Sequence, residues 1–241
     1  MLQAIKEGSE LYKKYFLRVI LIGFTIILPI QAIYTLAINF IAMPFEVFNL
    51  SLWTSIFQSI FMLMSLFIIL IPMISLASQG TRTNTVKTGQ IYGDTIKYAF
   101  FAYLISIPFS VVTTIGLLLL IIPGIILLVL FIGIPFVKVI EDETVPMVIK
   151  RSVSFGKENF IVLFGMLLLF AAADFLGSYL FSYLAIIISG QMAALNWAMM
   201  IFNMFLLPLF VFSVAKLYFS WNGEADLLQE GEFQKQLEQY R

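Results

Sequence analysis

The 241-residue chain contains no cysteine and no histidine. The absence of cysteine excludes disulfide bonds, thiolate nucleophiles and cysteine-ligated metals. The absence of histidine removes the commonest general base and the commonest metal ligand. An enzyme of this composition would have to use carboxylates, lysine, serine or tyrosine. We therefore expect neither a metal site nor another cofactor.

Charge is also scarce, and it is balanced. Only 12% of the residues are charged, as 14 basic and 14 acidic side chains, whereas 61% are hydrophobic. In soluble domains about a quarter of the residues are charged, and a surface that binds nucleic acid needs an excess of basic ones. The composition predicts an integral membrane protein and argues against nucleic acid as a partner.

Three long stretches carry almost no charge. Residues 19–81 contain only Glu46, residues 98–137 contain none, and residues 159–215 contain only Asp174. A spanning helix needs about 20 residues, and backbone groups in hydrocarbon must be paired within their own segment. Each stretch therefore fits two helices, and the fold class is an all-α polytopic membrane protein. The six transmembrane helices are predicted at about 16–39, 52–78, 98–120, 121–140, 160–186 and 195–219.

The turn between the third and fourth predicted helices has two candidate positions. Pro123-Gly124 and the segment Thr113–Gly116 are both helix-breaking signals inside one charge-free run. Either position leaves the number of helices at six.

The basic residues orient the predicted bundle. All 14 lie before or at the start of the first span, between spans two and three, between spans four and five, or after span six. Basic residues near span ends are retained on the cytoplasmic side, so both termini are expected to be cytoplasmic. Residues 1–221 form the predicted membrane domain. Residues 222–241 form an acidic cytoplasmic tail, which solubilises the chain or binds a partner.

Three segments on the basic side resemble one another. They are Ile5-Lys6-Glu7-Gly8, Val86-Lys87-Thr88-Gly89 and Ile149-Lys150-Arg151-Ser152, each ten or eleven residues before the first aromatic residue of a span. One interpretation is three repeated hairpins, each preceded by an amphipathic helix in the headgroup plane. The alternative is that any loop entering a membrane tends to be basic and amphipathic.

A set of motifs between residues 115 and 170 is typical of one family. The motifs are Ile121-Ile122-Pro123-Gly124-Ile125-Ile126, Pro135, Glu141, Lys150-Arg151-Ser152 and Lys157-Glu158-Asn159-Phe160. They resemble the YciC-like group of bacterial membrane proteins and the membrane domain attached to some glycerophosphodiester phosphodiesterases. The resemblance implies a six-helix bundle in a bacterial plasma membrane and brings no catalytic residues. The barrel-type catalytic domain of those phosphodiesterases is absent from this sequence, so their activity is not carried over.

Asp174 is the sharpest single signal in the spans. It lies about 14 residues into the fifth span, near the middle of the bilayer, where an acid is costly and usually faces a bundle interior. We hypothesise a polar layer of Gln31, Gln58, Asp174 and Asn203, with Thr113 and Thr114 as further candidates. Such a layer is a substrate or proton site, or alternatively a set of hydrogen bonds that fixes helix packing.

Basic residues before the fifth span are candidates for lipid contact. Lys150, Arg151 and Lys157 are predicted to bind anionic headgroups of the inner leaflet, because polybasic segments beside a membrane are attracted to anionic lipid. The preceding cluster Glu141-Asp142-Glu143 is either a carboxylate or cation site or, as we favour, a solvated loop neutralised by nearby bases.

These features favour a non-enzymatic plasma-membrane module that organises lipid or a membrane-protein partner, or that forms a homo-oligomer. The first alternative is a small proton-coupled transporter or permease centred on Asp174. The second is a lipid-modifying enzyme that uses Glu141, Asp142 and Glu143 at the inner interface.

Overall fold

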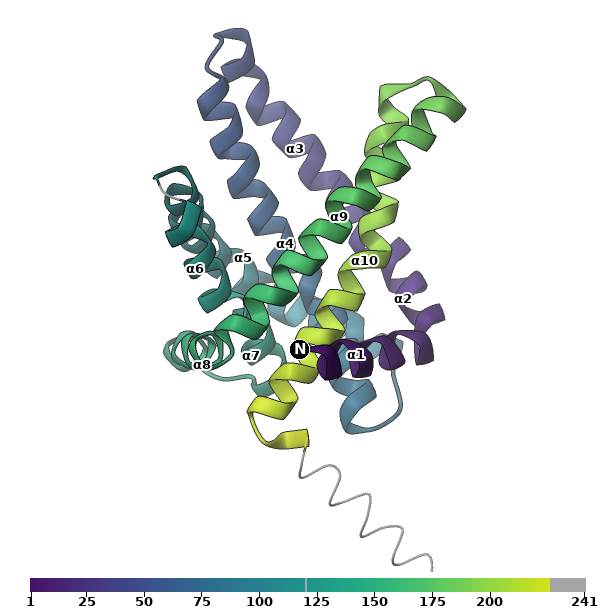
Figure 1. The fold of residues 1–241 in the computed structure, drawn as a ribbon, viewed down its shortest axis with the longest axis vertical. Coiled ribbons are helices and arrows are strands. Elements are labelled where there is room, and N and C mark those ends of the chain that lie inside the picture. Colours follow the sequence, from purple (N-terminus) through teal and green to yellow (C-terminus); the bar gives the residue numbers. More distant parts are fainter. Residues whose placement is uncertain (120, 226–241) are drawn as a thin grey trace, which may run out of the picture.

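The computed structural model describes residues 1–119 and 121–225. All regular structure in these ranges is helical (Figure 1). The helices in chain order are α1 (Leu2–Lys14), α2 (Phe16–Ile22), η1 (Gly23–Ile27), α3 (Leu28–Val47), α4 (Ser51–Arg82), α5 (Thr88–Leu119), α6 (Ile121–Phe131), α7 (Ile134–Glu141), α8 (Val145–Glu158), α9 (Phe160–Ser189) and α10 (Met192–Trp221). Of the predicted acidic tail, only residues 222–225 fall within the described part.

Six helical segments are long and apolar enough to cross a membrane. They are Phe16–Val47, Ser51–Arg82, Thr88–Leu119, Ile121–Glu141, Phe160–Ser189 and Ala194–Trp221. The all-α polytopic fold with six spanning helices is confirmed. The third helix begins at Thr88, ten residues before its predicted start, because hydropathy detects the apolar part of a helix and misses the polar turns that prolong it.

Both predicted positions for the turn between the third and fourth spans lie inside helices. Helix α5 runs on to Leu119 and α6 begins at Ile121. Pro123 stands in the first turn of α6, where the amide that it lacks would have no partner in the helix. Gly116 faces Gly124, and a methyl group on Gly116 would lie 3.1 Å from the Gly124 Cα. Both glycines therefore serve close packing of the two helices rather than the turn itself.

The first span contains a π-helical turn, η1. Within it the amide of Leu28 donates to the carbonyl of Gly23, five residues earlier. Pro29 follows directly and has no N–H with which to continue the regular pattern. A widened turn next to a proline redirects the neighbouring backbone bonds and is a recognised cause of helix bending.

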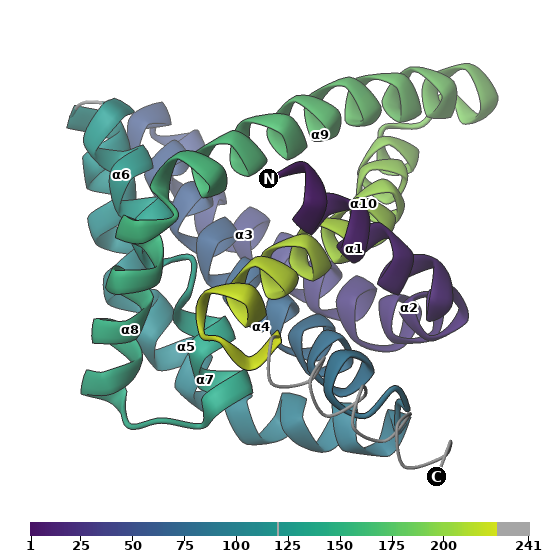
Figure 2. The same ribbon diagram turned by 60° about the horizontal axis from the view of Figure 1, so that its bottom comes forward.

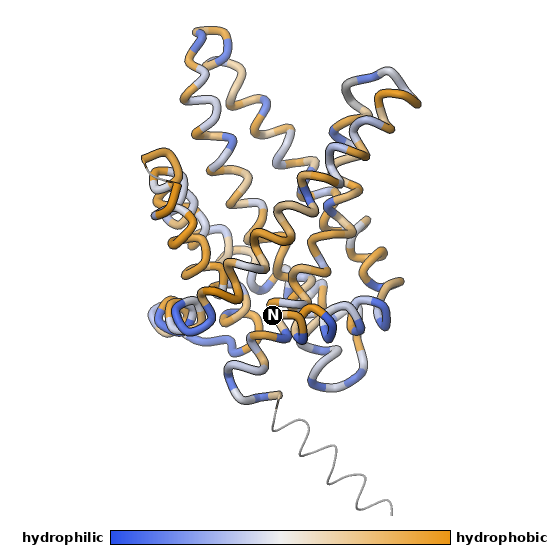
Figure 3. The backbone as a smooth tube through the Cα atoms, in the orientation of Figure 1, coloured by the Kyte–Doolittle hydropathy of each residue, from blue (hydrophilic) through white to orange (hydrophobic). Residues whose placement is uncertain are grey.

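The spans form three hairpins that come together at one end of the molecule and diverge toward the other (Figure 1). The hairpins are α3 with α4, α5 with α6, and α9 with α10. Helices α1, α7 and α8 lie where the hairpins converge, and hydrophilic residues concentrate there (Figure 3). We call this the polar end: α1, α7, α8, the loop 83–87 and residues 222–225.

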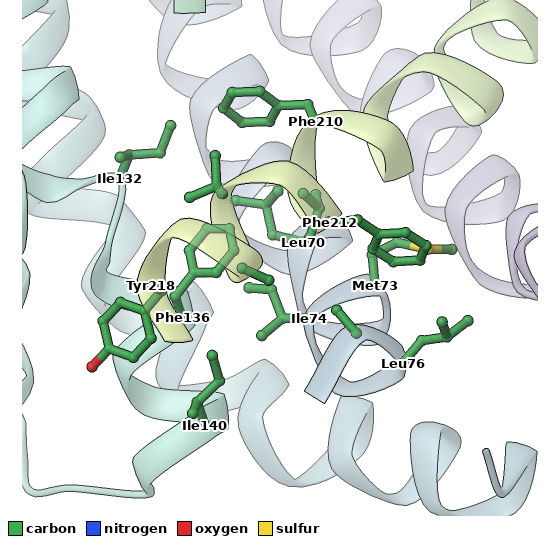
Figure 4. Close-up of a cluster of buried hydrophobic side chains, with 14 of the residues drawn as sticks. Leu70, Met73, Ile74, Leu76, Ile132, Phe136, Ile140, Phe210, Phe212 and Tyr218 are labelled. Atoms are coloured by element: carbon green, nitrogen blue, oxygen red, sulfur yellow. The ribbon is translucent and has the colours of Figure 1, made fainter. Parts of the chain in front are cut away.

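The core lies close to the polar end. Residues 69–78 of α4 and 210–215 of α10 are buried without interruption. Figure 4 shows Leu70 and Ile74 of α4 grouped with Phe136 of α7 and Phe212 and Tyr218 of α10. The same helices are less buried where the hairpins diverge, and α9 is the least buried of the six spans.

Two of the three predicted repeat units share a local structure. Tyr15 ends α1 with φ −111° and ψ 21°, and Asn159 ends α8 with φ −109° and ψ 20°. In each case the next residue, Phe16 or Phe160, begins a span. Figures 1 and 2 show that α1 and α8 both lie across the long axis of the bundle. An amphipathic helix therefore precedes the first and third hairpins.

The prediction of a separate short helix before the second hairpin is wrong. Helix α5 runs unbroken from Thr88 to Leu119. Its first turns pack along α4, where Ile91 and Thr95 are buried and Ser75 Oγ donates to Asp94 Oδ2 at 2.5 Å. These contacts hold the segment in line with the span, so no break occurs.

Gly8 places α1 in backbone contact with α10. A methyl group there would lie 2.7 Å from the Ser213 nitrogen and 2.8 Å from its Cα, and backbone atoms cannot move aside cheaply. We expect Gly8→Ala to lower the free energy of unfolding by roughly 1–3 kcal/mol, the usual cost of overpacking. Denaturant unfolding of the purified protein in detergent would measure it.

Gly93→Ala is the matched control. Gly93 also lies inside a helix, but nothing stands within 4 Å of an added methyl group. This variant should be as stable as the wild type or gain up to about 1 kcal/mol, because alanine favours the helix. If Gly8→Ala were equally harmless, α1 would not be held against α10 by this contact.

Candidate functional site

Helix α8 is built to lie against the bundle on one side only. Thr144 precedes it in an extended conformation, and Pro146 occupies its first turn, where proline is favoured. Its buried face includes Val148, Ser152 and Phe155. Ser152 Oγ donates to the carbonyl of Leu130 at 3.0 Å, which fixes α8 to α6.

The three basic residues predicted to bind headgroups are not equivalent. Lys150 and Lys157 are exposed and lie seven residues apart, which puts them on the same face of α8. Arg151 instead forms an ion pair with Glu141, whose carboxylate also accepts a hydrogen bond from Tyr218 Oη at 2.6 Å. The hydrogen bond with Glu141 raises the pKa of the Arg151 guanidinium. Arg151 therefore ties α8 to α7, whereas Lys150 and Lys157 remain exposed.

The cluster Glu141-Asp142-Glu143 is neutralised by bases. Asp142 pairs with Lys97 at 2.6 Å and with Lys138 at 3.0 Å. Lys138 Nζ also donates to the carbonyl of Glu143 at 2.9 Å. These contacts fit the favoured interpretation of a neutralised loop, and they join the start of α5 to the end of α7.

Helix α1 has the same layout as α8. Its buried residues are Ala4, Gly8 and Leu11, and Lys6 and Lys13 are exposed on the opposite face. The predicted headgroup contacts did not include these two lysines. Their spacing of seven residues, repeated in Lys150 and Lys157, is the sequence pattern that corresponds to this shared layout.

Two of the four polar residues predicted to form an intramembrane layer do come together. Gln31 of α3 and Asn203 of α10 line one cavity of about 270 Å³, together with Ser65 of α4. Gln31 Oε1 is buried and has no hydrogen-bond partner within the described residues. Gln58 is exposed on α4 and does not line this cavity.

Asp174 lies on a different part of the bundle. It is partly exposed on α9, and its carboxylate accepts a hydrogen bond from Ser178 Oγ at 3.3 Å, one turn further along. Gly177, on the same face of α9, packs against the ring of Phe202 in α10, and a methyl group on it would clash with the Phe202 Cζ. Asp174 does not line the cavity of Gln31 and Asn203, so the structure does not gather the predicted layer into one site.

Thr113 and Thr114 are buried in α5. Neither hydroxyl has a hydrogen-bond partner in the part of the chain that the structure describes. Thr113 lines a separate, apolar cavity of about 250 Å³ between α5, α6 and α8. This pair is therefore not part of the cavity that Gln31 lines.

The ion pair of Asp142 gives a pH-dependent contribution to stability. The hydrogen bond from Lys97 lowers the pKa of the Asp142 carboxyl below its ordinary value. The ionised form is thus favoured by folding, so this stabilisation is present above the pKa of the unfolded chain, about 4. It is lost as the pH falls through the lower pKa of the folded state.

Asp142→Asn tests this contribution. Asp142 has a left-handed backbone with φ 53°, which asparagine also adopts readily, so the variant removes charge without straining the chain. We expect a modest loss of stability at pH 7 that shrinks as the pH falls below about 4 and disappears below the lower pKa of the folded state. Unfolding midpoints measured across this range would show it, and a deficit that persisted undiminished in acid would contradict the ion-pair explanation.

No family model, curated protein or solved structure matches the chain. The resemblance to the YciC-like group stays a prediction from the motifs.

Proposed function

We propose that the protein is a non-enzymatic membrane protein that gathers anionic lipid around its polar end. One observation carries the proposal: α1 and α8 each present two exposed lysines on the face opposite to their buried face. The four lysines are Lys6, Lys13, Lys150 and Lys157. None of them takes part in an ion pair or hydrogen bond within the described residues.

The placement of these lysines suits a headgroup layer. Both helices lie across the ends of the spans (Figures 1 and 2), at the level where an amphipathic helix meets lipid headgroups. A basic residue near an anionic surface contributes about 1 kcal/mol. Four lysines would supply on the order of 4 kcal/mol in total, enough to enrich anionic lipid around the protein.

The polar end is proposed to face the cytoplasm of a bacterial plasma membrane. The basic residues within the described ranges lie at or beside this end, whereas the loops joining α3 to α4 and α9 to α10 carry none. Basic loops are retained on the cytoplasmic side. The motif resemblance supports a bacterial plasma membrane, whose inner leaflet would supply the anionic lipid.

Replacing the four lysines tests the proposal. The variant Lys6→Gln, Lys13→Gln, Lys150→Gln, Lys157→Gln should lose enrichment of phosphatidylglycerol over phosphatidylcholine by about tenfold or more. The measurement is the lipid retained by protein reconstituted in nanodiscs of mixed composition. Wild-type enrichment should also weaken with added salt, because the attraction is screened.

The control replaces the same four lysines with arginine. It keeps the charge, so it should retain the wild-type enrichment. Equal enrichment by the glutamine variant and the wild type would refute headgroup binding by α1 and α8.

A small proton-coupled transporter is the second candidate. It is favoured by the cavity that Gln31 and Asn203 line, in which Gln31 Oε1 lacks a partner among the described residues. Pairing of that oxygen with a polar solute would offset its desolvation cost. Asp174 of α9 is the acidic residue predicted for this candidate, and it lies outside the cavity.

Flux measurements in liposomes test this candidate. Wild type should conduct protons or small solutes. Asn203→Leu and Asp174→Asn should abolish conduction in protein that still unfolds at the wild-type midpoint. Gln58→Leu is the control, since Gln58 is exposed and does not line the cavity. No flux through the wild type would eliminate transport.

A further inference from the structure

A cavity of about 390 Å³ opens at the polar end between α1, α4 and α10. Figure 2, which brings this end forward, shows α1 beside α10. Four charged residues line the cavity: Glu7, Glu10 and Lys14 of α1 and Lys216 of α10. A volume of this size is typical of sites for small molecules.

The cavity is lined by both polar and apolar side chains. Leu11 of α1 and Phe219 of α10 contribute the apolar surface, and Thr81 near the end of α4 adds a hydroxyl. The backbone contact of Gly8 with Ser213 sets α1 beside α10. The cavity is therefore framed by three packed helices.

Two polar groups in the cavity lack partners. Lys216 is half-buried, yet it makes no hydrogen bond or ion pair with any residue that the structure describes. Thr81 Oγ1 is buried and is also unpaired within the described ranges. Lys14 Nζ donates one bond, to Asn84 Oδ1 at 2.8 Å, and keeps two further hydrogens. Donors for a negatively charged group are thus available from all three helices.

The opposite charge is present in the same cavity. Glu7 and Glu10 lie one turn of α1 apart, and Glu7 accepts one hydrogen bond, from Gln3 Nε2 at 3.0 Å. A simple anion would be repelled by these carboxylates, and a simple cation by the two lysines. A ligand that carries both charges satisfies both sets of groups.

We propose that this cavity binds a headgroup that carries both a phosphate and a primary ammonium. The phosphate lies between Lys216, Lys14 and Thr81, and the ammonium donates to Glu7 and Glu10. The site stands beside α1 at the level of the headgroups, so an aminophospholipid such as phosphatidylethanolamine can reach it from the leaflet. This site does not depend on the proposed function, because it uses other residues and a lipid of no net charge.

The test compares two lipids with the same chains. Phosphatidylethanolamine has three ammonium hydrogens to donate, whereas phosphatidylcholine has the same phosphate and net charge and none. Native mass spectrometry of the full chain in detergent should show at least tenfold tighter binding of phosphatidylethanolamine. Equal binding of the two lipids by the wild type would overturn the proposal, and this comparison needs no variant.

Variants locate the site. Lys216→Met should weaken the binding of both lipids, because both carry the phosphate, and Glu10→Gln should abolish the preference for phosphatidylethanolamine. Lys87→Met and Glu46→Gln, which change exposed residues outside the cavity, should retain it. Unchanged affinity in Lys216→Met together with an unchanged preference in Glu10→Gln would overturn the assignment to this cavity. If Lys216→Met does not fold, Glu10→Gln decides the location.

A soluble headgroup identifies the source of the ligand. If glycerophosphoethanolamine without acyl chains competes as well as the lipid, the cavity takes a soluble zwitterion of the same chemistry. If it does not compete, the ligand is the membrane lipid. Phosphatidylglycerol enrichment, measured separately with the four-lysine variant, reports on the proposed function alone.

Discussion

Burial of one half of α4 on all sides is the constraint on which the fold depends. Residues 69–78 of that helix are all buried, and α1, α3, α5, α7 and α10 contact it. In a bilayer, apolar helices gain no hydrophobic energy from leaving lipid for one another, so close packing and hydrogen bonds must hold them. Such bonds gather around this half of α4, between Ser75 and Asp94 and between Arg82 and Glu224. The hairpins can therefore diverge at the other end without loss of the core.

The basic side chains of the polar end divide into those that join helices and those that remain exposed. Arg151 and Lys97 hold helices together through Glu141 and Asp142, whereas Lys150 is exposed and makes no ion pair or hydrogen bond within the described residues. The same division applies to α1, where Lys14 bonds to the loop at Asn84 and Lys13 is exposed. Neighbouring residues of one charge thus serve different purposes because consecutive positions point about 100° apart on a helix.

The sequence predicted what depends on composition and distance along the chain. The number of spans followed from the charge-free runs. The sequence could not predict in which direction each side chain points around its helix axis. The four polar residues at similar predicted depth were therefore expected in one layer, although only Gln31 and Asn203 share a cavity. The glycine at 124 was misread for a related reason. Its lack of a side chain serves contact with α5, and local sequence does not distinguish that from a turn.

The π-helical turn at Gly23–Ile27 determines which side chains of α3, the rest of the first span, face the neighbouring helices. It accommodates one extra residue, which corresponds to a rotation of about 100° for the rest of the helix. Because of this rotation, Gln31 and Tyr34 line the cavity shared with α4 and α10 while Ile33 and Leu36 are exposed. Loss of one residue from the turn would leave a regular helix of almost the same length and apolarity. That helix would present a different stripe of side chains to the bundle, so a deletion that leaves the hydropathy almost unchanged would turn part of the exposed side of α3 toward its neighbours.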